Sequence, residues 1–62
     1  MPLSPRQKQI IRRIRDGDTD KEIASRLRIR EGTVGFHVTR ILWKLRAKSR
    51  AHAVAIFFGL VR

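Results

Sequence analysis

The chain has 62 residues, so we expect a single domain over residues 1–62 with one small hydrophobic core and no room for an enclosed substrate cleft. Fifteen Lys and Arg against five Asp and Glu give a net charge of +10, which attracts polyanions such as nucleic acid or an anionic membrane. Cys is absent, so disulfides and thiolate metal sites are excluded.

The first predicted helix begins after Ser4. Ser4 is suited to cap it, Pro5 suits the first helical position, and Gln7 completes a capping box. Isoleucines within residues 10–14 follow at helical spacing and form an apolar stripe. The Asp-Gly-Asp sequence at 16–18 then ends the helix.

The second predicted helix begins at Thr19, which forms another capping box with Glu22. Ile23 and Leu27 belong to a short inward face. This helix has barely two turns, so its stability depends on packing against its neighbours. It ends near Leu27 and leads into a turn at 28–30.

The third predicted helix runs from about Glu31 to Leu45, and its apolar residues repeat at helical spacing. The residues expected to face the core are Val34, Val38, Ile41, Leu42 and Leu45. The residues expected on or beside the opposite, solvent-facing side are Gly32, Gly35, Phe36, Thr39, Arg40 and Trp43. The periodicity therefore separates a structural face from one available for binding.

The fourth predicted helix covers Arg50–Phe58, with Ser49 as its N-cap and Gly59 as its end. It has more apolar circumference than one small core needs. The face assigned to the core comprises Ala51, Val54 and Phe58. The second face, comprising Ala53 and Phe57, is expected to contact another copy of the chain. No strand-like alternation occurs, so the fold class is predicted to be all-α.

The second helix, the short turn and the longer third helix have the dimensions of a helix-turn-helix. A helix fits the major groove of B-DNA, where the base edges are distinguishable. Together with the charge of +10, this arrangement indicates double-stranded DNA as the partner.

Segments along nearly the whole chain resemble the LuxR/FixJ/GerE type of DNA-binding domain. The matching segments are Leu3–Gln7, Asp16–Ala24, Leu27–Ile29, Gly32–Val34, His37, Ile41, Lys44–Leu45, Ser49–Arg50 and Ala53–Val54. The resemblance implies a four-helix bundle whose third helix reads DNA and whose fourth helix mediates a homodimer. It also implies a cytoplasmic bacterial transcription regulator, normally with a separate N-terminal sensor domain.

The residues expected to contact DNA are Lys21, Thr33, Gly35, Phe36, Thr39, Arg40, Lys44 and Arg50. Thr33 has two interpretations, a phosphate contact and a local cap. At Gly35 this chain departs from the family, where Lys, Arg or Asn is common. Gly35 has no side chain for a bidentate contact with guanine, whereas Phe36 is suited to pack on a thymine methyl group.

Two more departures from the family lie in the turn before the third helix. Arg28 stands where the family often has Gly, so a positive φ there would cost about 1 kcal/mol. Arg30 stands where Ser usually caps the helix, and loss of that cap costs about 1 kcal/mol. His37, at the edge of the inward face, is expected to be a structural residue hydrogen-bonded within the fold.

A basic module that binds a membrane surface or another protein is the main alternative function, because Phe57, Phe58 and Leu60 lie near the end of the chain. No apolar run approaches the roughly 18 residues of a membrane span. An enzyme is not expected. Asp16, Asp18 and Gly17 are explained as a loop, and no acid is placed to activate His37. We therefore expect no catalytic residue, no metal and no cofactor.

Overall fold

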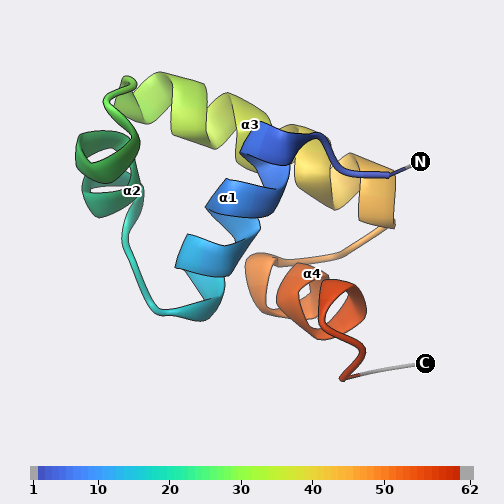
Figure 1. The fold of residues 1–62 in the computed structure, drawn as a ribbon. Coiled ribbons are helices and arrows are strands. Elements are labelled where there is room, and N and C mark those ends of the chain that lie inside the picture. The colour runs from blue at the N-terminus through green and yellow to red at the C-terminus, as the bar shows by residue number, and fades with distance from the viewer. Residues whose placement is uncertain (1, 61–62) are drawn as a thin grey trace.

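The computed structural model describes residues 2–60 and contains four helices within them (Figure 1). They are α1 (Pro5–Arg15), α2 (Asp20–Leu27), α3 (Glu31–Leu45) and α4 (Arg50–Phe57). α1 and α3 cross at the centre, while α2 packs against α3 and α4 packs against both α1 and α3. The all-α prediction with a helix-turn-helix at α2–α3 is confirmed.

Both predicted capping boxes are formed. At the start of α1, Ser4 Oγ accepts a hydrogen bond from Gln7 N at 3.2 Å, and Ser4 N donates to Gln7 Oε1 at 3.0 Å. At the start of α2, Thr19 Oγ1 accepts from Glu22 N at 3.2 Å, and Thr19 N donates to Glu22 Oε1 at 2.8 Å. These bonds satisfy amide groups that a helix start leaves without a partner.

The turn between α2 and α3 lacks such support. Arg28 ends α2 in the left-handed region, with φ 57° and ψ 45°, where a Cβ atom crowds the backbone. Arg30 occupies the N-cap of α3 without any side-chain capping bond in the described part of the chain. Arg46 ends α3 with φ 54°, a second left-handed arginine that the sequence did not predict.

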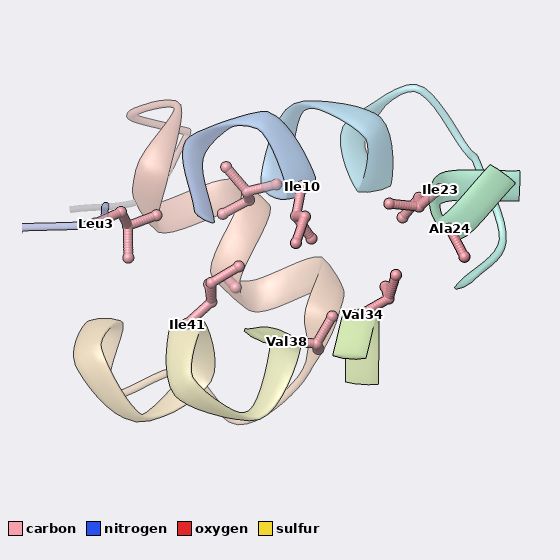
Figure 2. Close-up of a cluster of buried hydrophobic side chains, with 9 residues drawn as sticks. Leu3, Ile10, Ile23, Ala24, Val34, Val38 and Ile41 are labelled. Atoms are coloured by element: carbon pink, nitrogen blue, oxygen red, sulfur yellow. The ribbon is translucent and has the colours of Figure 1, made fainter. Parts of the chain in front are cut away.

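The core lies between α1 and α3, with α2 and α4 closing its ends. Figure 2 shows Ile10 of α1 directed toward the side of the core formed by Val34, Val38 and Ile41 of α3. Ile23 is also fully buried and brings α2 into the same cluster. The inward face predicted for α3 is therefore correct.

The predicted division of α4 into two faces is wrong at Ala53 and Ala51. Ala53 is 2% exposed and belongs to the core of its own chain, so it is not available for a contact with another copy. Ala51, predicted to face the core, is exposed. Phe57 is half-buried and packs on the core, as does Phe58, which follows the last helical residue. The short loop after α3 turns α4 so that Ala53 faces inward, a rotation that periodicity alone does not determine.

Candidate nucleic-acid interface

One side of α3 remains uncovered along its length. Phe36 is 59% exposed and Trp43 is 68% exposed, whereas Val34 and Ile41 on the opposite side are almost completely buried. Thr39 and Arg40 are also exposed, and Gly35 lies half-buried beside them. The structure thus brings together the predicted residues Gly35, Phe36, Thr39 and Arg40, which we call the α3 open face.

Gly35 leaves a gap in the α3 open face. A Cβ atom added at Gly35 would meet no atom within 4 Å, so packing within the chain does not require glycine there. The Thr39 hydroxyl donates a hydrogen bond to the Gly35 carbonyl at 3.1 Å. This bond occupies the hydroxyl proton of Thr39 and leaves its oxygen as an acceptor.

Arg40 and Phe36 form a stacked pair within the α3 open face. The guanidinium carbon of Arg40 lies 5.3 Å from the centre of the Phe36 ring. Such a cation–π contact is worth about 0.5–1 kcal/mol at an exposed site. It restricts a long flexible side chain, so Arg40 is partly oriented before any partner arrives. The sequence signal was the spacing of four residues, which places the two side chains on adjacent turns.

The first turn of α3 offers unpaired donors. Thr33 is exposed, and none of the side-chain hydrogen bonds described for residues 2–60 belongs to it, so the local-cap interpretation is not supported. The first amide groups of a helix lack partners within the helix, and its N-terminus carries partial positive charge. This end of α3 therefore has the chemistry of a phosphate contact.

Lys44 and Arg50, both predicted to contact DNA, already have partners within the chain. Lys44 Nζ donates to Gln7 Oε1 at 2.8 Å, and Gln7 itself is 5% exposed. Arg50 binds both carboxylate oxygens of Asp20, with Nη2 to Oδ2 at 2.9 Å. These hydrogen bonds hold the pKa of Asp20 below its usual value. Any phosphate would have to share Lys44 with Gln7 and Arg50 with Asp20.

Lys21, the remaining predicted residue, is exposed on α2. Arg28 and Arg30 are exposed in the turn that joins α2 to α3. Arg28 and Arg30 place positive charge beside the N-terminal end of the α3 open face, and Lys21 adds to the charge of α2.

His37 differs from its predicted role. It is half-buried, and its Nδ1 atom is buried without a hydrogen-bond partner among the described residues. Burial lowers the pKa of His37, and the nearby charges of Arg6 and Lys44 lower it further. Both effects disfavour the charged imidazolium, and the His37 ring contacts Phe36 edge-on at 6.0 Å between centroids.

Residues 2–60 lack two other kinds of site. No group of three or more His, Asp or Glu side chains is gathered there in a way that would hold a metal ion. None of the helices in this range is long and apolar enough to cross a membrane.

Comparison with known proteins places these features in a family. The model of the family described as bacterial regulatory proteins, luxR family, matches residues 1–57. The chain is 42% identical over 53 residues to the transcriptional regulatory protein DesR of Bacillus subtilis, covering 86% of the chain and 27% of DesR.

Two further relatives also match most of this chain over about a quarter of their own length. The nitrate/nitrite response regulator protein NarL of Escherichia coli K12 is 45% identical over 51 residues, which cover 82% of the chain and 24% of NarL. The transcriptional activator protein SolR of Ralstonia nicotianae is 41% identical over 61 residues, which cover 95% of the chain and 26% of SolR. The chain thus spans about a quarter of the length of the curated relatives it matches.

Proposed function

Since the chain belongs to the luxR family of bacterial regulatory proteins, we propose that it binds duplex DNA through the α3 open face and acts in transcription regulation. The family is one of regulators, so the chain is a regulatory domain rather than an enzyme. The observation that carries the proposal is a long helix with one buried side and one open side, the latter carrying Phe36 stacked with Arg40.

Each residue of the α3 open face has a role in this proposal. Phe36 packs against a thymine methyl group, and Arg40 donates to a guanine edge or a neighbouring phosphate. Thr39 offers its oxygen to a base amino group, since its proton is bonded to Gly35 O. Gly35 contributes no side-chain contact of its own, and the space beside it has room for a larger residue facing the groove.

Affinity in this proposal comes mainly from phosphates. The amide groups at the first turn of α3, together with Thr33, bind one phosphate, while Lys21 lies beside the neighbouring backbone. Lys44 and Arg50 contribute positive electrostatic potential. Each remains hydrogen-bonded within the chain, Lys44 to Gln7 and Arg50 to Asp20. Each phosphate neutralised steepens the dependence of log affinity on log salt by about 0.9.

The test is a selection from random duplex DNA at about 0.15 M salt, where exposed charges are screened beyond about 8 Å. The selected duplex and a scrambled one are then compared by fluorescence anisotropy with the wild type, Phe36→Ala and Arg40→Ala. Loss of a good base contact costs about 1–3 kcal/mol, so each variant should lose discrimination between the duplexes. Unchanged discrimination in both variants would show that α3 does not read the sequence.

A homodimer formed through α4 when the chain is on DNA remains part of the proposal, with Ala53 removed from its interface. The exposed side of α4 includes Ala51, and a charge placed there leaves the core intact. Ala51→Glu should therefore weaken binding to a duplex with two half-sites much more than binding to a single half-site. Equal losses on the two duplexes would contradict the dimer.

A further inference from the structure

The outward side of α1 is a second concentration of positive charge. Helix α1 contains no acidic residue, and Lys8, Arg12 and Arg15 are exposed on it at spacings of four and three residues. This spacing places the three side chains along one side of the helix, with Arg13 half-buried next to them. We call these four residues the α1 basic face.

The acidic residues of the chain leave most of this charge unbalanced. Three carboxylates elsewhere have partners of their own, in the pairs Asp18–Arg26, Asp20–Arg50 and Glu22–Thr19, and Glu31 lies exposed at the start of α3. Arg15 pairs with Asp16 at 3.1 Å. No ion pair described within residues 2–60 involves Lys8, Arg12 or Arg13.

The α1 basic face lies across the core from the α3 open face. Ile10 of α1 points into the core from one side, and Val38 and Ile41 of α3 point into it from the other (Figure 2). The two shorter dimensions of the molecule are 20 and 19 Å. A duplex bound at the α3 open face would therefore leave the α1 basic face in solvent.

The shape and chemistry of the α1 basic face suit a phosphate backbone. Arg12, Arg13 and Arg15 line a hollow between α1 and Leu27 of α2, together with Gln9 and with Asp16, whose carboxylate is paired with Arg15. The Arg15 guanidinium also lies 4.6 Å from the centre of the Phe58 ring, which restricts its motion. Arginine presents a planar fork of donors that matches the oxygens of a phosphate.

A protein partner fits this face less well than a nucleic acid. Protein interfaces centre on buried aromatic or aliphatic anchors. The large exposed hydrophobic residues of the described chain are Phe36, Trp43 and Leu60, and none of them belongs to α1. Binding to the DNA backbone needs cations and hydrogen-bond donors and no such anchor.

We propose that the α1 basic face binds the backbone of a second DNA duplex, so that one chain bridges two duplexes. The inference rests on the proposed binding of the first duplex by α3. The second contact is independent of sequence, because it is made to phosphates, and it weakens steeply with salt.

The experiment measures the two contacts separately with the 62-residue chain. Anisotropy of one labelled duplex reports the first contact. Energy transfer between a donor-labelled and an acceptor-labelled duplex, mixed in excess over protein at low salt, reports bridging. In the double variant Lys8→Gln/Arg12→Gln, bridging should be weaker by about tenfold or more. The log–log dependence of bridging on salt should become shallower by about 1.8. Its affinity for a single duplex should change by less than about threefold, since exposed charges are screened over this distance.

The matched control is Arg46→Gln/Lys48→Gln, which removes the same charge from exposed positions outside α1 that have no ion pair described within residues 2–60. It should bridge like the wild type. Bridging that survives in the α1 variant, or a wild type that binds one duplex and never bridges, would overturn the inference and leave the proposed function intact. Equal loss of bridging in the control would overturn it too, since total charge would then be responsible. If the wild type binds no duplex, the proposed function itself fails.

Discussion

Helices α1 and α2 begin with complete capping boxes, whereas α3, the longest helix, begins with no side-chain cap in the described structure. The contrast continues beyond the cap. Arg28 before α3 has a left-handed backbone, and Gly35 weakens the interior of the helix by roughly 0.5–1 kcal/mol. The starts of α1 and α2 thus follow the local rules of stability, whereas the start of α3 departs from them at Arg28 and Arg30. Arg46, at the other end of α3, is a further departure.

We infer that the region around the α3 open face gives up local stability for contact with DNA. Arg28 and Arg30 replace residues that would fit the backbone better, and both add positive charge next to α3. Functional sites commonly keep such departures because the rest of the fold compensates for them. Here the compensation comes from the buried side of α3, which packs on α1 and α2.

The largest expected effect is a difference in the free energy of unfolding between substitutions on the buried side and on the open side of α3. Ile41 is 1% exposed, so Ile41→Ala should lower the free energy of unfolding by about 2–5 kcal/mol. Phe36→Ala removes a ring that is 59% exposed and should change it by only about 0.5 kcal/mol while weakening DNA binding. Urea unfolding and anisotropy measure the two properties. A large loss of stability in Phe36→Ala would contradict the separation.

The two left-handed arginines form a natural pair. Arg28→Gly and Arg46→Gly should each raise the free energy of unfolding by about 1 kcal/mol, because glycine adopts a positive φ without strain. In a domain this small that corresponds to a rise in Tm of about 4–8 °C. Only Arg28→Gly should also weaken DNA binding markedly, because Arg28 lies beside the N-terminal end of the α3 open face, whereas Arg46 lies at the other end of the helix. If Arg28→Gly stabilises the fold and leaves DNA affinity unchanged, stability is not exchanged for DNA affinity at this position.

A smaller effect is expected at the missing cap. Arg30→Ser should supply the side-chain acceptor that α3 lacks and stabilise the chain by about 0.5–1 kcal/mol. It also removes a charge beside the first turn, so DNA affinity should fall at low salt and converge on the wild-type value as salt increases. Arg30→Ala is the control, since it removes the charge without adding a cap. If Arg30→Ser were no more stable than Arg30→Ala, the uncapped start would carry no stability penalty.

Local signals in the sequence predicted most of the fold. Capping boxes and apolar periods located all four helices. A possible positive φ at Arg28 followed from the glycine that the family often has at this position. The orientation of α4 was not predictable, since Ala53 and Ala51 are equally apolar and only tertiary packing distinguishes them. The ion pair of Arg50 with Asp20 and the bond of Lys44 to Gln7 join residues far apart in the chain, so no local pattern indicates them.

The most direct test of the account is the salt dependence of DNA binding by Gly35→Lys. A side chain at position 35 has room, and lysine also favours the helix, so the variant should fold at least as stably as the wild type. Leu60→Lys, which adds the same charge at an exposed position outside α1 and α3, is the control. The account predicts that Gly35→Lys binds a single duplex more tightly, with a log–log salt slope steeper by about 0.9, and that Leu60→Lys does not. If Gly35→Lys leaves the affinity unchanged at low and moderate salt, position 35 does not face DNA and the α3 open face is not the binding surface.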